Sequence, residues 1–247
     1  MFYYSVFTAI TSFAVGVVCL CNIWENNILT PVRSFFWHYS IGFLAWGFSQ
    51  SLSVLVNSGA QINYPSFVIL RIISLLATII AYGLFVRGTT SLFVKDRLIT
   101  KLIPLFYGSA MAGFFVYTLL MTEIESIIIT AVVFWGLILP VNMLLGCAFL
   151  FLFLKGTSFD TVKKKPSTII LSFAWFYVFV LNIILWFNLV NYPHDFYFLK
   201  LAASQEWFVA RAIGHLLILT GFILYCQHLR HLKIPEYLKF VKNKEKQ

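Results

Sequence analysis

Apolar runs long enough to cross a lipid bilayer recur along the whole of this 247-residue chain. A helix needs about 20 consecutive apolar residues to cross a hydrocarbon layer about 30 Å thick. The chain is 60% hydrophobic and 11% charged, and its mean hydropathy of +0.87 is typical of membrane proteins. The runs that reach this length lie near residues 3–23, 34–56, 66–86, 102–121, 126–154, 167–190 and 206–228.

These runs predict an all-α, polytopic integral membrane bundle of seven transmembrane helices, because a helix satisfies its own backbone groups inside lipid. Lys and Arg concentrate after the third, fifth and seventh runs, whereas the connections after the second, fourth and sixth are neutral, acidic or mixed. The positive-inside rule then places the N-terminus outside and the C-terminus in the cytoplasm. We expect a transmembrane domain over 1–229 and a basic cytoplasmic tail over 230–247.

The formal net charge of +9 follows from this loop bias, so it indicates contact with the lipid bilayer and no nucleic-acid partner. Motifs of common enzyme and metal sites are missing from the sequence. It contains no HExxH, no GxSxG, no paired intramembrane carboxylates and no phosphate-binding glycine loop. The last run also lacks a lysine that could carry retinal. We therefore predict no catalytic residue and no metal site, and the sequence leaves the cofactor unknown.

The last run, EWFVARAIGHLLILTGFILY, carries Arg211 and His215 one helical turn apart. Ionisable side chains are costly in hydrocarbon, so both should face protein or water and mark a functional position. In the third run, Arg71, Ser74, Thr78 and Tyr82 follow one another at i, i+3, i+7 and i+11. This polar stripe should also point into the bundle.

Arg71 and Arg211 each lie about five residues into a helix that enters from the outside, so we expect them at similar depth. Three interpretations follow. In the first, the stripe and the Arg211/His215 face form a cationic pocket for an anionic or amphiphilic ligand group. In the second, Arg211 forms an ion pair with Glu206, Glu125 or Asp195 that only locks helices together. In the third, histidines bind a haem or contact a quinone. For haem, His38 and His215 fail as a ligand pair, because their expected depths differ by about 12 Å.

The last run also resembles a known family. Its pattern W-x6-GHLLIL-x-GFILY over Trp207–Tyr225 is similar to the final helix of the seven-helix membrane sensor domains that precede bacterial and archaeal histidine kinases. That resemblance implies a sensor of membrane-associated or small apolar signals in a prokaryotic inner or plasma membrane. His215 is the single motif position that the resemblance carries over to this chain. Since the tail is too short for an output domain, it further implies a module that acts through a protein partner or an oligomer.

The sequence thus favours a non-enzymatic, sensor-like or accessory membrane subunit. Its expected ligand-binding residues are Arg71, Ser74, Thr78, Tyr82, Arg211 and His215. Two alternatives remain open. Pro140, near the middle of the long fifth run, would favour a small-solute transporter or channel if it broke that helix beside a water-filled path. A membrane redox subunit is the other alternative.

Overall fold

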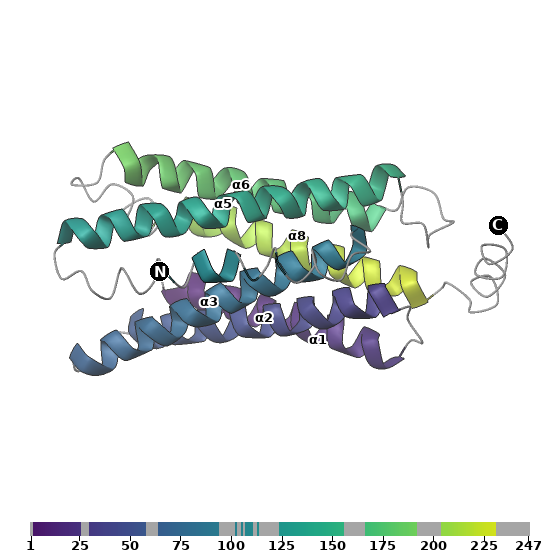
Figure 1. The fold of residues 1–247 in the computed structure, drawn as a ribbon, viewed down its shortest axis with the longest axis horizontal. Helices are drawn as coiled ribbons and strands as arrows, with labels where there is room; N and C mark the ends of the chain where they lie inside the picture. The colour runs from purple at the N-terminus through teal and green to yellow at the C-terminus, as the bar shows by residue number, and fades with distance from the viewer. Residues whose placement is uncertain are drawn as a thin grey trace, which may run out of the picture.

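The structure is a computed structural model. It describes residues 2–25, 30–57, 64–93, 124–155, 166–191 and 204–230, together with positions 102, 105, 107–110 and 113. Within these residues the chain is helical (Figure 1). The long helices are α1 (Phe2–Glu25), α2 (Thr30–Asn57), α3 (Tyr64–Phe93), α5 (Ile124–Lys155), α6 (Pro166–Asn191) and α8 (Gln205–Arg230). All-α architecture is confirmed for the part of the chain that is described.

Five helical segments are long and apolar enough to cross a membrane. They are Ser5–Trp24, Ile72–Phe93, Gly136–Leu154, Pro166–Asn188 and Gln205–Gln227. The predicted integral membrane character is therefore confirmed. α2 is not among the five, and its serines and Gln50 make it less apolar than its neighbours. The predicted fourth span, 102–121, and the predicted tail, 230–247, lie largely outside the described residues, so seven spans and their orientation stay predictions.

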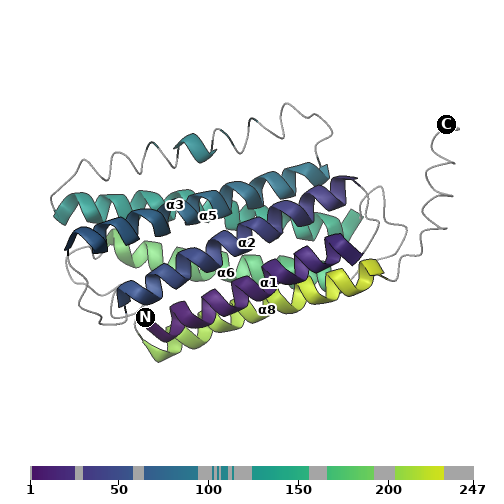
Figure 2. The same ribbon diagram turned by 90° about the horizontal axis from the view of Figure 1, so that it is seen from below.

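The helices form a ring in chain order. α1 packs against α2, α2 against α3, α5 against α6 and α6 against α8; α8 then packs against α1, and a sparser contact joins α3 to α5 (Figures 1 and 2). α1 and α8 run parallel, because Phe7 contacts Phe208 near their starts, with ring centroids 6.2 Å apart, and Cys226 reaches the Val18 carbonyl further along. We call the half of the bundle where α1 and α8 begin the outer half, after its predicted orientation.

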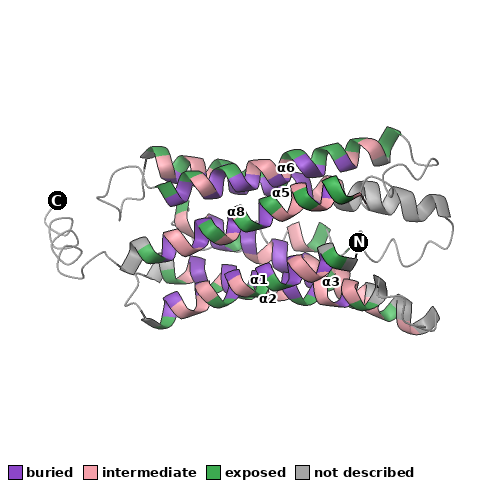
Figure 3. Ribbon diagram, turned by 180° about the vertical axis from the view of Figure 1, so that it is seen from behind, coloured by how far each residue is buried: buried purple, intermediate pink, exposed green. Residues whose placement is uncertain are grey.

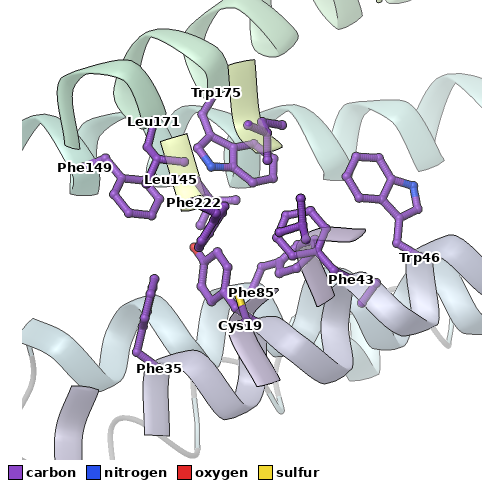
Figure 4. Packing of buried hydrophobic residues seen from close by; sticks show 14 of the residues in the cluster. Cys19, Phe35, Phe43, Trp46, Phe85, Leu145, Phe149, Leu171, Trp175 and Phe222 are labelled. Carbon is purple, nitrogen blue, oxygen red and sulfur yellow. The ribbon is translucent and has the colours of Figure 1, made fainter. Parts of the chain in front are cut away.

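Aromatic rings fill the middle of this ring of helices. The aromatic core consists of Phe35, Tyr39, Phe43, Phe85, Phe149, Trp175 and Phe222. Neighbouring centroids in it lie from 4.3 Å apart, between Phe35 and Tyr39, to 6.5 Å apart, between Phe43 and Trp175. These rings come from α2, α3, α5, α6 and α8, and Figure 4 shows the labelled ones close together. Each of the seven side chains is at most 1% exposed. Many large apolar residues are exposed as well, and Figure 3 shows where exposed residues lie along the helices.

Outward-facing apolar side chains such as Ile80, Phe173 and Phe187 are more than half exposed. In water such a surface would favour aggregation, whereas lipid tails solvate it without cost. The bundle is therefore apolar both inside and outside, as a protein in contact with the lipid bilayer must be.

Pro140 lies inside α5. Proline has no N–H to donate to the carbonyl four residues earlier, and its ring loosens the adjoining turn. The Tyr107 hydroxyl donates a hydrogen bond of 2.8 Å to the Leu137 carbonyl at this turn. A side chain from the segment before α5 thus supplies a donor where the helix is disturbed, and α5 continues unbroken to Lys155.

Candidate functional site

The start of α8 is fixed by a serine cap. Ser204 accepts a hydrogen bond of 3.1 Å from the Trp207 amide on its Oγ, and another of 3.1 Å from the Phe208 amide on its carbonyl. A serine in this position satisfies amides that the first turn of a helix leaves unpaired. Glu206, in that first turn, also suits the positive end of the helix dipole. The cap sets Arg211 and His215 in the second and third turns, within the apolar segment.

Arg211 is half-buried on α8 and meets α6. Its Nη2 lies 3.5 Å from Oδ1 of Asn182, which is 2% exposed. That distance is at the long limit of a hydrogen bond. A guanidinium has five donors, so it can serve more than one acceptor at the same time.

His215 is buried on the same face of α8, at 5% exposure. Its ring centroid lies 5.1 Å from that of Trp46 on α2. Trp46 in turn lies 6.0 Å from the ring of Tyr82 on α3. The structure thus connects the predicted site residues Tyr82 and His215 through Trp46, a residue that no sequence pattern singled out.

Ser74 and Thr78 point toward α2. The Ser49 hydroxyl donates to the Ser74 carbonyl at 2.8 Å, and it lies 3.0 Å from the Ser74 hydroxyl and 2.8 Å from the Thr78 hydroxyl. Ser74 returns a bond of 3.1 Å to the Ser49 carbonyl. Hydrogen bonds between hydroxyls and backbone join helices in lipid, where water is absent.

The polar stripe of α3 is therefore directed inward, but the described side chains of its outer part meet α2. Within the described residues α3 packs on α2 and α5 and makes no close backbone approach to α8. The backbone of Arg71 lies in α3, while its side chain is not among those described. The structure does not bring Ser74 or Thr78 together with Arg211.

Ser49→Ala should lower the free energy of unfolding by about 1–2 kcal/mol, since it removes the shared partner of Ser74 and Thr78 from a buried position. Denaturation of the protein in mixed micelles measures this loss. Ser51→Ala is the matched control, because Ser51 bonds only to the Gly47 carbonyl of its own helix among the described residues. Equal effects of the two substitutions would contradict the role of Ser49 in joining α2 to α3.

Two further hydroxyls lie on the inner face of α1. Thr8 is 0% exposed and Ser12 is 1% exposed, and neither side-chain oxygen has a hydrogen-bond partner within the described part of the protein. A buried hydroxyl without a partner costs about 1–3 kcal/mol. The spacing of Thr8, Ser12, Val15 and Cys19 is that of one helical face, but Ser and Thr are common in membrane helices, so the spacing alone does not mark a site.

We call Thr8, Ser12, Asn182, Arg211 and His215 the polar cluster. Its members come from α1, α6 and α8 and lie in the outer half. Asn142, just after Pro140, is also fully buried, and neither atom of its amide has a partner in the described residues. Chemically, the polar cluster combines one fixed positive charge with neutral hydrogen-bond donors, an arrangement suited to an anionic group.

The two histidines considered for haem lie far apart along the bundle. His38 bonds within its own helix, where its Nδ1–H donates a hydrogen bond of 2.6 Å to the Ser34 carbonyl. It precedes Trp46, the neighbour of His215, by eight residues, or about 12 Å along α2. Among the described residues, no three His, Cys, Asp or Glu side chains gather as a metal site would require.

Comparisons of the chain with models of protein families, with curated proteins and with solved structures found no match.

Proposed function

We propose that this protein is a non-enzymatic, sensor-like membrane subunit whose polar cluster binds the anionic group of a small ligand. The observation that carries the proposal is Arg211, a charged side chain on an apolar helix that sits beside buried Asn182 and one turn from buried His215. A charge in such a position is costly unless a partner compensates it. An anion that binds there would be attracted by the positive charge of Arg211.

The aromatic core supports sensing over open conduction. Below the polar cluster the interior is occupied by Phe43, Trp175 and Phe222, and the ring centroid of Phe43 lies 6.5 Å from that of Trp175 and 5.5 Å from that of Phe222. A ligand that enters from the outer half therefore meets a closed floor, and its binding energy can act on how α8 packs against α1 and α6. The resemblance of Trp207–Tyr225 to membrane sensor domains agrees with this proposal and adds a protein partner that receives the signal.

Binding of an alkyl anion should raise the thermal stability of the protein in lipid nanodiscs. At a concentration 100 times its Kd, a ligand stabilises by about 2.7 kcal/mol. We expect at least one of hexanoate, hexyl sulfate and hexyl phosphate to produce a shift that hexanol does not. Arg211→Gln should abolish it, because the amide keeps polarity but removes the charge.

Arg87→Gln is the matched control, since Arg87 lies on an exposed face of α3, toward the far end from the polar cluster. Its ligand shift should equal that of the natural protein. If Arg211→Gln keeps the full shift, or lowers only the stability of the ligand-free protein, the charge locks helices together and the proposed binding role is wrong.

Transport is the second candidate, and Pro140 in α5 is the observation that favours it. For a solute to cross the protein along α5, the side chains of the aromatic core would have to move apart next to Asn142. Uptake of labelled hexanoate into proteoliposomes distinguishes the two: a sensor binds the anion without net flux, whereas a transporter accumulates it inside.

A further inference from the structure

α1, α2 and α3 are closely joined, and Figure 2 shows them side by side; we call them the first unit. A Cβ built at Gly16 of α1 would stand 2.9 Å from the Leu44 side chain of α2. A Cβ built at Gly42 of α2 would stand 2.7 Å from the ring of Phe85 on α3. The Ser40 hydroxyl also donates a hydrogen bond of 2.8 Å to the Gly16 carbonyl. Because contacts this short bring a side chain against a neighbouring backbone, they oppose any sliding or rotation of one helix on the next.

α5, α6 and α8 are joined by the same kind of contact, and we call them the second unit. A Cβ at Gly146 of α5 would stand 3.0 Å from the ring of Phe176 on α6, and the Ser172 hydroxyl donates to the Gly146 carbonyl at 2.9 Å. A Cβ at Gly221 of α8 would stand 2.7 Å from the Leu171 side chain of α6. Each described glycine whose Cβ would meet another helix within 4 Å thus has its nearest atoms in its own unit.

The boundary between the two units is lined by aromatic rings. Phe35 of α2 lies 6.1 Å from Phe149 of α5 at an interplanar angle of 76°, and 6.4 Å from Phe222 of α8 at 19°. A thiol contact also crosses the boundary, where Cys226 donates to the Val18 carbonyl at 4.0 Å. Aromatic pairs attract each other over centroid separations of about 4.5–7 Å, both stacked and edge to face. Rings at this boundary can therefore exchange one arrangement for another without losing contact.

We infer that the first and second units slide past each other as rigid bodies along the axis of the bundle. The aromatic rings between the units repack during this shear, while the glycine contacts inside each unit stay fixed. Shear between packed helices is on the order of 1–2 Å. The polar cluster spans the boundary, because the ring centroid of His215 on α8 lies 5.1 Å from that of Trp46 on α2. The shear is a property of the bundle itself and does not depend on a ligand.

Bilayer thickness supplies the force that tests this shear. Sliding along the axis changes the length of the apolar surface that the two units present together, so a thicker bilayer favours a larger offset between them. Spin labels carried on p-acetylphenylalanine leave the four native cysteines in place. Pulsed EPR then measures the distance between two labels in the full chain, in nanodiscs of a short-chain and of a long-chain phosphatidylcholine.

The cross-unit pair of labels replaces Trp24 at the end of α1 and Phe187 near the end of α6. These positions lie toward opposite ends of the bundle, because α6 runs antiparallel to α8 and so ends in the outer half, where α1 begins. The matched controls lie within one unit: Trp24 with Ile69 of α3, and Phe187 with Leu154 of α5. All four side chains are more than half exposed, so the labels avoid the core.

The cross-unit distance should differ between the two lipids by about 1–2 Å, and both control distances should stay the same. A cross-unit distance that is the same in both lipids would overturn the inference. Equal changes in all three distances would overturn it as well, since the bundle would then deform throughout and not at one boundary. Both of these results leave the proposed function intact, because its test is the binding of an anion.

Discussion

Phe222→Ala is expected to lower the free energy of unfolding by about 3–5 kcal/mol, the largest effect of any substitution considered. Phe222 is 0% exposed and its ring meets Tyr39 at 5.4 Å, Phe43 at 5.5 Å and Phe149 at 6.2 Å. Truncation leaves a cavity that none of these rings can fill without losing its own contacts, and dispersion between packed side chains is what holds helices together in lipid. Titration with a denaturing detergent in mixed micelles measures the loss.

Phe173→Ala is the control for that substitution. Phe173 is on α6 but faces outward, with 59% of its surface exposed. Lipid tails replace whatever contacts it loses, so the stability should change by less than about 0.5 kcal/mol. A similar loss for both variants would mean that the aromatic core does not carry the packing energy that its geometry suggests.

Gly42→Ala should cost about 1–3 kcal/mol, the second largest effect, although it adds a single methyl group. A Cβ at this position would stand 2.7 Å from Cε1 of Phe85 and 3.3 Å from the Ala81 carbonyl oxygen. Phe85 cannot retreat, because Phe43 lies 4.7 Å away on one side and Trp175 lies 5.9 Å away on another. The methyl group must therefore push α2 and α3 apart.

Gly83→Ala gives the opposite expectation on α3. Within the described part of the protein, and apart from the adjoining backbone of α3 itself, no atom lies within 4 Å of a Cβ built there. Since alanine favours a helix by about 1 kcal/mol over glycine, this variant should be as stable as the natural protein or more so. Unfolding measured side by side separates steric effects from helix propensity. If both glycine variants lose stability equally, close approach at Gly42 is not the cause.

Much of the architecture followed from apolar run length alone. The run expected over 167–190 corresponds to α6 (Pro166–Asn191), and the run over 206–228 corresponds to α8 (Gln205–Arg230). These agree because lipid thickness sets the length of a spanning helix and Pro166 or the Ser204 cap sets where it starts. The described segments around 102–113 were too few to test the fourth run in the same way.

The partners of each helix face could not be predicted in this way. The spacing of Ser74 and Thr78 predicted that they face into the bundle. Their hydrogen bonds to Ser49 depend on how α3 is rotated against α2. That rotation depends on packing between the two helices, including the close approach at Gly42. The sequence indicated that placing His215 in a membrane costs free energy, but it did not indicate that Trp46 would lie beside it. Periodicity gives the direction of a side chain relative to its own helix, and only tertiary packing gives what it meets.

The order of the ring has a consequence for how the protein is assembled as it is inserted into the bilayer. α1 with α2, and α2 with α3, can pair as soon as the later helix of each pair enters, because neighbours along the chain are neighbours in space. The seam between α1 and α8 is different, since it must wait until α8 arrives. Thr8 and Ser12 lie on one side of that seam and Arg211 and His215 on the other. The polar cluster therefore forms only at the last step of helix docking, when α8 brings Arg211 and His215 to the bundle.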